Sequence, residues 1–174
     1  MAYGLLLIRI VFGLTLAAHG AQKLFGWFGG GGPHGTAANF EKMHFRWPLA
    51  MAALAGLAEF GGGILFAAGL LTPLAAFALV VVMLIAILTV HRPNGFWVTG
   101  GGYEYNLAIV AVAIGIAATG PGRISLDRAA GWDDDLSGAW WGAGVAAAGV
   151  VAALLTLTAA RSHTLHGGAA THGR

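Results

Sequence analysis

The sequence predicts an all-α protein, a transmembrane helical bundle with a four-helix core and a fifth transmembrane helix near the C-terminus. Composition is the first reason: 57% of the 174 residues are hydrophobic and only 9% are charged, against about 25% charged in soluble domains. Distribution is the second, because the apolar residues gather in segments near the roughly 20 residues that a helix needs to cross a bilayer. A surface with so little charge suits lipid better than water.

Five apolar segments qualify as spans, and they cover residues 4–22, 48–71, 73–90, 103–119 and 140–158. No basic leader precedes the first span, so we expect it to remain as a membrane anchor. Pro48 suits a first helical turn, where its missing N–H is not needed. Thr72 and Pro73 separate the second and third spans so tightly that these should be antiparallel neighbours. The six tryptophans all fall near segment ends, as in the aromatic belts of membrane proteins.

The spans divide the chain into four expected parts. These are a four-helix membrane domain (1–120), an acidic hydrophilic linker (121–139), a fifth transmembrane helix (140–160) and a disordered polar tail (161–174). In the first loop, Phe40, Met43 and Trp47 recur at helical spacing. This spacing predicts a short helix that lies in the membrane interface.

Charge and cysteine content exclude several functions. The formal net charge is +2 and no Lys/Arg-rich stripe appears, so no nucleic-acid partner is expected. Without cysteine, the chain forms no disulfide, no thiol redox centre and no cysteine-ligated cluster. His163, His166 and His172 match no metal-ligand spacing, so no metal site is expected.

The distribution of basic residues among the loops predicts the topology. Lys and Arg are more numerous on the side that holds the C-terminal tail. By the positive-inside rule, this predicts a multi-pass protein of the cell (plasma) membrane with its N-terminus outside and its C-terminus in the cytoplasm. The expected partners are the lipid bilayer and, beyond it, a redox protein or a second copy of the chain.

Ionisable residues inside the predicted spans are the strongest functional signal, because each costs roughly 2.5–3.5 kcal/mol on insertion scales. His19 and Lys23 are four residues apart on one face of the first helix. His91 ends the third helix, and Glu104 begins the fourth. With alternating helix directions, these ends lie on the same side of the membrane. These four residues, with the nearby Asn106, are therefore the candidate ligand-binding or proton-handling residues.

Arg9 and Glu59 lie deeper in their spans and are expected to pair within the membrane. Gly13 and Gly20 lie beside the polar row of the first helix and allow another backbone to approach. Glu59 and Glu104 each lie in a stripe of Ala and Gly, which predicts that both acids face helix–helix interfaces. A purely structural alternative stays open, in which Arg9 and Glu59 fasten two helices and the terminal cations extend to lipid headgroups.

Several of these residues fall in short motifs. They are Arg9 with Gly13; His19-Gly20-Ala21-Gln22-Lys23 with Phe25; Glu59-Phe-Gly-Gly-Gly, followed by Leu-Leu-Thr-Pro; and His91 with Gly102-Tyr103-Glu104-Tyr105-Asn106. In order and spacing, the motifs resemble the DoxX family over about residues 4–120. The resemblance implies a small, four-helix bacterial membrane protein that serves as a component of an oxidoreductase system. Described members include quinone-reducing subunits of a thiosulfate-oxidising enzyme and a partner of superoxide dismutase in thiol stress defence.

The leading hypothesis is a membrane subunit of a redox system that binds a quinone or a similar apolar ligand at the polar end of the bundle. His19, His91 and Glu104 can donate protons to a reduced quinone oxygen, and Lys23 can stabilise a developing anion. The first alternative is a non-enzymatic membrane partner, a scaffold or a small transporter. The second is a haem-binding subunit with His19 and His91 as axial ligands.

Overall fold

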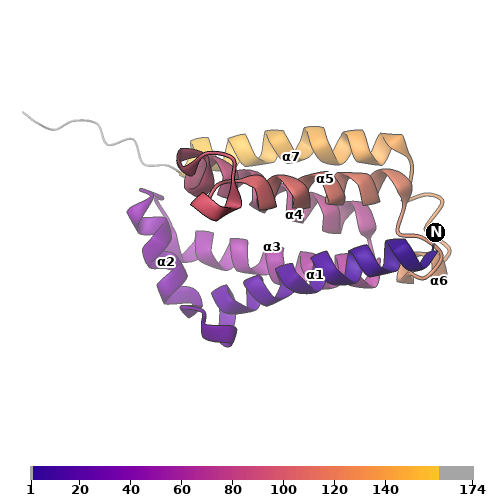
Figure 1. The fold of residues 1–174 in the computed structure, drawn as a ribbon, viewed down its shortest axis with the longest axis horizontal. Coiled ribbons are helices and arrows are strands. Elements are labelled where there is room, and N and C mark those ends of the chain that lie inside the picture. The colour runs from indigo at the N-terminus through magenta and orange to yellow at the C-terminus, as the bar shows by residue number, and fades with distance from the viewer. Residues whose placement is uncertain (1, 161–174) are drawn as a thin grey trace, which may run out of the picture.

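The computed structural model describes residues 2–160, and in that part of the chain the regular structure is helical, without strands. Five long helices run back and forth in a bundle (Figure 1). They are α1 (Ala2–Phe25), α3 (Pro48–Ala68), α4 (Thr72–Ala86), α5 (Glu104–Thr119) and α7 (Ala139–Ala160). The predicted all-α bundle is confirmed, and the tail predicted to be disordered, residues 161–174, lies outside the described residues.

Two short helices, α2 (Gly32–Lys42) and α6 (Leu126–Ala129), lie at opposite ends of this bundle (Figure 1). α2 is a short helix in the first loop, as predicted, but it lies earlier than the predicted face: it contains Phe40, whereas Met43 and Trp47 follow its end. One-turn segments complete the chain: η1 (Trp27–Gly29), η2 (Ile87–His91), η3 (Arg92–Asn94) and η4 (Val98–Gly100). Because η2 and η3 continue α4, one apolar helix runs from Thr72 to Asn94.

Four helices of the described chain are long and apolar enough to cross a membrane: α1, α3, α7 and the continuous helix Thr72–Asn94. α5, which corresponds to the predicted fourth span, has 16 residues. This length gives about 24 Å of rise, against a hydrocarbon core of about 30 Å. The five predicted spans are therefore four full-length helices and one shorter apolar helix.

α1 and α3 pack antiparallel and very closely, because glycines meet along their seam. A Cβ at Gly13 would lie 2.6 Å from the carbonyl oxygen of Gly63, and one at Gly63 would lie 2.5 Å from that of Gly13. Gly20 meets the backbone of Gly56 and Phe60 in the same way. The predicted role of Gly13 and Gly20 in close backbone approach is confirmed. The seam fixes the register of the two helices and thereby decides which charges meet.

α4 occupies the middle of the bundle, where it contacts α3, α5 and α7. Its buried residues Leu79 and Met83 share one hydrophobic core with Phe66 of α3, Ile109 of α5 and Val145 of α7. Because lipid tails are as apolar as these side chains, close packing rather than the hydrophobic effect holds the helices together.

The small-residue stripe of α5 faces outward, so the prediction that it faces a helix interface is wrong. Ala108, Ala111 and Gly115 are exposed, whereas Ile109 and Ile116 are buried in the core. The bulky face makes more van der Waals contacts with α4 and α7 than the Ala/Gly face would, and it is the face that is buried.

Candidate functional site

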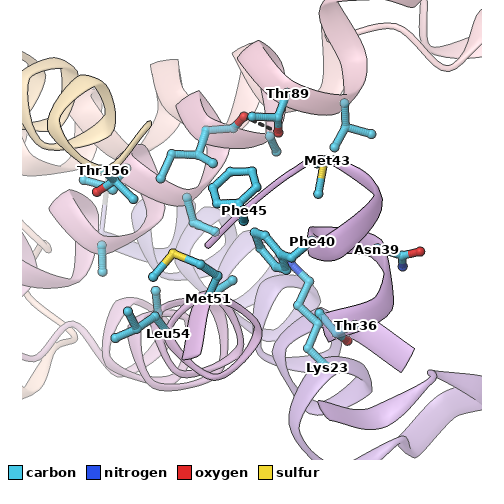
Figure 2. Close-up of a pocket in the computed structure, with 18 of the residues that line it drawn as sticks. Lys23, Thr36, Asn39, Phe40, Met43, Phe45, Met51, Leu54, Thr89 and Thr156 are labelled. Atoms are coloured by element: carbon cyan, nitrogen blue, oxygen red, sulfur yellow. Dashed lines mark hydrogen bonds between the residues drawn. The ribbon is translucent and has the colours of Figure 1, made fainter. Parts of the chain in front are cut away.

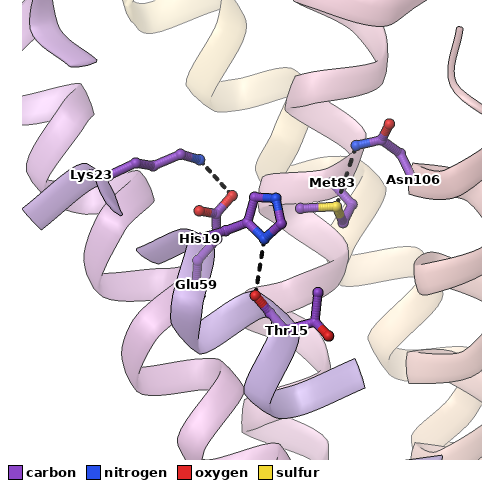
Figure 3. A network of polar contacts seen from close by, with 6 residues as sticks. All are labelled: Thr15, His19, Lys23, Glu59, Met83 and Asn106. Atoms are coloured by element: carbon purple, nitrogen blue, oxygen red, sulfur yellow. Dashed lines mark hydrogen bonds and ion pairs between the residues drawn. The ribbon is translucent and has the colours of Figure 1, made fainter. Parts of the chain in front are cut away.

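Lys23 and Glu59 form an ion pair between α1 and α3, toward the end of the bundle that carries α2 (Figure 3). The Lys23 Nζ donates a hydrogen bond to Glu59 Oε1 at 2.5 Å. The Glu59 side chain is only 4% exposed, whereas that of Lys23 is 29% exposed. The carboxylate of the pair is therefore shielded, whereas the lysine side chain is partly accessible.

The second carboxylate oxygen of Glu59, Oε2, is buried and has no hydrogen-bond partner among the described residues. Leaving a buried acceptor unmatched costs about 1–3 kcal/mol, so such atoms in native proteins call for a water, an ion or a functional role. Lys23 also has spare capacity, since an ammonium has three donors and Glu59 engages one. The pair can thus make further polar contacts.

Arg9 does not pair with Glu59, in contrast to the predicted intramembrane pair. α1 runs antiparallel to α3, so residues early in α1 lie beside the end of α3. Arg9 consequently lies against Gly69, where an added Cβ would occupy the space of the guanidinium, while Lys23 reaches Glu59. The glycine seam sets this register, and it separates Arg9 from the middle of α3.

Arg9 belongs to a second charged site at the α6 end of the bundle. It is 0% exposed, and its Nη2 donates to the carbonyl oxygen of Ile124 at 2.5 Å. Its Nε and Nη1 have no hydrogen-bond partner among the described residues. Asp127, which is also fully buried, stabilises the Arg9 charge electrostatically. Arg9 thereby holds the segment around α6 against α1.

Asp127 fastens the start of α4. Its Oδ1 accepts a hydrogen bond from the N–H of Leu71 at 2.7 Å. Its Oδ2 accepts from the N–H of Thr72 at 3.0 Å and from the Thr72 hydroxyl at 2.6 Å. A carboxylate in this position satisfies N–H groups that a helix terminus leaves unpaired, and it is favoured by the helix dipole. A residue of the predicted hydrophilic linker is thus an integral part of the bundle.

An apolar cavity of about 470 Å³ lies beside Lys23, within the range of about 300–1,000 Å³ that is typical of ligand sites. Its walls come from α2, α3, α4 and α7 (Figure 2). The polar side chains in its lining are those of Lys23, Thr36, Asn39, Thr89 and Thr156, and all others are Ala, Val, Ile, Leu, Met or Phe. The cavity therefore suits a mainly apolar ligand with few polar atoms.

The turn before α2 brings this helix across the end of the bundle. Gly26, Gly29 and Gly32 have φ values of 71°, 78° and 64°, which side chains with a Cβ rarely adopt. After the turn, Phe40 of α2 packs edge-on against Phe45, with 5.1 Å between ring centroids. Both rings line the cavity (Figure 2), so α2 and the segment that follows it form one of its walls.

The end of α4 widens into a π-helical turn where it lines the cavity. This turn is η2, and its residues Thr89 and Val90 belong to the lining. The Thr89 hydroxyl donates to the carbonyl oxygen of Ile85 at 2.7 Å. π-turns are rare and occur frequently at functional sites. Here the wider turn changes the direction in which the side chains that follow α4 leave the helix, and two of them line the cavity.

His19 lies one turn before Lys23 on α1 but does not line the cavity. It is exposed, and its Nδ1 lies 2.9 Å from the carbonyl oxygen of Thr15. His91 is also absent from the lining. The cavity beside Lys23 therefore offers no pair of histidine ligands for a haem.

His91 and Glu104 stabilise the loop that joins α4 to α5. The His91 Nδ1 lies 2.8 Å from the carbonyl oxygen of Gly101, and Glu104 Oε2 accepts a hydrogen bond from the N–H of Val98 at 3.0 Å. The loop lies at the same end of the bundle as α2 (Figure 1). Among the described residues, however, no hydrogen bond joins His91 or Glu104 to Lys23.

Asn106 is buried between α5 and α4, where its Nδ2 lies 3.3 Å from the Met83 sulfur (Figure 3). A thioether is a weak acceptor, so this contact adds little energy. Among residues 2–160, no group of three or more His, Asp or Glu side chains is placed to hold a metal ion.

Two parts of these sites were not identified from the sequence. The first is the cavity wall made by Phe40, Met43 and Phe45, although the spacing of Phe40 and Met43 marked an apolar helical face. The second is Asp127, which was assigned to a hydrophilic linker. The sequence did carry a local signal for a helix there. Ser125 caps α6, because its hydroxyl accepts a hydrogen bond from the N–H of Arg128 at 3.2 Å.

The residues around the cavity fit a quinone ring in part. The apolar walls accommodate the ring, and Lys23 offers a charge-assisted donor to one ring oxygen. The predicted proton donors His19, His91 and Glu104 do not line the cavity. Lys23 is therefore the one ionisable residue among the described lining residues, and Glu59 lies behind it.

Comparison with known families agrees with the motifs and the fold. The DoxX family model matches residues 4–92, just over half of the chain. The match includes Lys23 and Glu59 and ends before α5 and α7. No curated protein and no solved structure matches the chain significantly. With more than half of its length matched and with its apolar membrane-spanning helices, the chain is an integral membrane protein of the DoxX family.

Proposed function

We propose that this protein is a membrane subunit of a redox system and that it binds a quinone, or a similar apolar ligand, in the cavity beside Lys23. One observation carries the proposal. The cavity is apolar except for four uncharged polar side chains and Lys23, whose ion-pair partner Glu59 keeps a buried oxygen unmatched. Small-molecule sites commonly combine apolar walls with a few placed polar groups.

A bound quinone supplies the electron- and proton-accepting chemistry. Lys23 donates a hydrogen bond to a ring oxygen and stabilises negative charge that develops on it. Glu59 orients the ammonium, and its free Oε2 provides a place for a proton or a water at the same pair. The apolar walls keep bulk water away, which strengthens these electrostatic interactions.

The proposed location is the bacterial inner membrane, with the N-terminus outside and the C-terminus in the cytoplasm. Lys42, Arg46 and Arg92 belong to loops at the α2 end, against Arg123 and Arg128 at the α6 end. The positive-inside rule then places the α2 end in the cytoplasm. A redox partner or a second copy of the chain would reach the cavity from that side.

A second candidate is a non-enzymatic membrane partner, scaffold or small transporter. The observation that favours it is that the predicted proton donors lie elsewhere. His91 and Glu104 contact the backbone of the loop between α4 and α5, and His19 is exposed. These contacts leave Lys23 as the one ionisable group at the cavity. One polar contact serves recognition of a ligand as well as it serves redox chemistry.

Equilibrium binding of a tail-free benzoquinone to the purified protein in lipid nanodiscs tests the proposal. Lys23→Gln should weaken binding about tenfold or more, because a hydrogen bond from a charged group contributes about 1.5–3 kcal/mol. The matched control is Lys42→Gln, an exposed lysine of α2 outside the cavity lining. This variant should bind as the unmodified protein does.

Absence of binding to the unmodified protein, or equal loss in both lysine variants, would contradict the proposal. Co-purification of a protein whose attachment depends on Lys23, in a sample that binds no quinone, would favour the non-enzymatic partner.

A further inference from the structure

We infer that a second hollow, formed mainly by α4 and α7, holds the long apolar tail of the ligand whose ring lies beside Lys23. This inference rests on the proposed function. The hollow has a volume of about 380 Å³, and no charged or hydroxyl-bearing side chain lines it. Its walls include Leu74 and Phe77 of α4 and Gly144 and Ala148 of α7. α7 lies outside the matched family region.

The second hollow continues the cavity along the membrane. Phe77 lines both spaces, so they meet at one side chain. Together their linings run from Leu71, just before α4, to Val90 of η2, and along α7 from Trp141 to Thr156. The first stretch corresponds to about 28 Å of helix rise, close to the hydrocarbon thickness of about 30 Å. The two spaces follow the same two helices and share Phe77, which makes them one apolar track in the proposed site.

The track is polar at one end only. Lys23, Thr36, Asn39 and Thr89 all belong to the first cavity, and the second hollow adds no such group. A molecule with one polar head and one long apolar chain matches this distribution. A ligand that is polar at both ends does not.

Small residues of α7 leave space for a chain along the track. Gly144, Ala148 and Ala152 follow at four-residue intervals on α7, and all three line the track. Because the bilayer is itself apolar, fit and van der Waals contact decide whether a chain leaves lipid for the groove.

Two quinones that share one ring, the first without a tail and the second with a geranylgeranyl tail, test the inference in nanodiscs. Ala148→Phe fills the second hollow, whereas Ala147→Phe places the same side chain on an exposed neighbouring position that lines neither space. Ala148→Phe should weaken binding of the tailed quinone by about fivefold or more and leave the tail-free ring within about twofold. Ala147→Phe should change neither.

Unchanged binding of the tailed quinone to Ala148→Phe would overturn the inference, and so would equal loss in the two phenylalanine variants. Failure of the tail-free ring to bind the unmodified protein would instead contradict the proposed function. If the tailed quinone still bound and Ala148→Phe still weakened it, the second hollow would be supported as a chain site.

Photo-crosslinking of the unmodified protein keeps the test decisive if Ala148→Phe does not fold. The probe is a geranylgeranyl quinone with a diazirine at the end of its tail. The expected labelled peptides contain Leu74 or residues 136–148. Labelling spread over the exposed face of α1, around Leu7 and Leu14, would overturn the inference.

Discussion

The two buried charged sites of this protein lie toward opposite ends of the α1–α3 pair, and they differ in the space around them. Around Arg9, the backbone of Gly69, the carbonyl of Ile124 and the carboxylate of Asp127 fill the surroundings, and Arg9 lines neither hollow. Beside Lys23, a cavity of about 470 Å³ adjoins the ammonium. Both sites contain unmatched polar atoms, and the second of them adjoins a cavity of ligand size.

This difference shows that a charge in a membrane segment is not by itself a sign of chemistry. Each charge is costly to insert, and both sites offset that cost with an opposite charge. At the α6 end the compensation fastens a loop to the bundle, because Asp127 also caps α4. At the α2 end, the ion pair with Glu59 holds Lys23 beside an apolar cavity. The neighbouring cavity, rather than the burial of the charge, is the reason that we propose ligand binding at Lys23 and a structural role at Arg9.

The largest expected effect is on stability and comes from Asp127→Ala. This change removes three hydrogen bonds and a negative charge that favours the buried Arg9 guanidinium. Each buried donor left unmatched costs about 1–3 kcal/mol, so the loss should be about 3 kcal/mol or more, measurable as the unfolding free energy in mixed detergent micelles. Asp135→Ala, at an exposed position, is the control. If Asp127→Ala were as stable as the control, the α6 site would not be a fastening.

The next effect comes from the seam that sets the register of both sites. Gly63→Ala places a Cβ 2.5 Å from the Gly13 carbonyl oxygen, and overpacking of this kind costs about 1–3 kcal/mol. Because the seam holds Lys23 against Glu59, ring binding should weaken as well. In Gly61→Ala the new Cβ meets nothing within 4 Å, so stability and binding should remain. Equal behaviour of the two variants would show that the seam does not control the sites.

The ion pair at the cavity should be replaceable without loss of stability but not without loss of binding. Lys23→Met alone leaves Glu59 buried and unpaired, and should cost about 1–3 kcal/mol because Lys23 is partly exposed. The double variant Lys23→Met/Glu59→Leu should return to within about 1 kcal/mol of the unmodified protein, yet bind no quinone ring. If the double variant bound the ring normally, the ion pair would have only a structural role, like the Arg9 site.

The smallest effect is expected from the exposed ion pair near α6. Asp133 accepts a hydrogen bond from Arg128 at 2.9 Å and raises the pKa of the Arg128 guanidinium above its ordinary value. A raised pKa means that the contribution to stability is present below the ordinary arginine pKa and is lost only as the pH rises through the raised one. Because exposed ion pairs contribute little to stability, Arg128→Ala should lower the melting temperature only slightly, and by the same amount at neutral and mildly alkaline pH. A clear decrease would show that this pair also fastens the loop.

Local patterns predicted the helices well, because crossing a bilayer depends on the length and hydropathy of each segment. Most of the run 48–71 appears as α3, Pro48–Ala68. The face predicted from Phe40, Met43 and Trp47 was wrong in its extent, because α2 ends at Lys42 and only Phe40 lies in it. Partner choice was harder. The predicted Arg9–Glu59 pair failed because the register of α1 on α3 depends on which glycines meet, and no local pattern states this. The outward Ala/Gly face of α5 failed for a related reason, since its neighbours decided which face is buried.

By itself, the sequence determined that this chain lies in a bilayer as a helical bundle, that it carries the motifs of the DoxX family, and which few charges enter the membrane. Those properties follow from composition, segment length and the order of short motifs. Only the tertiary structure decided that Lys23 rather than Arg9 meets Glu59, that Asp127 is buried, and that α2 and α7 help enclose a cavity. Such contacts join residues distant in the chain, and their geometry depends on how closely whole helices approach.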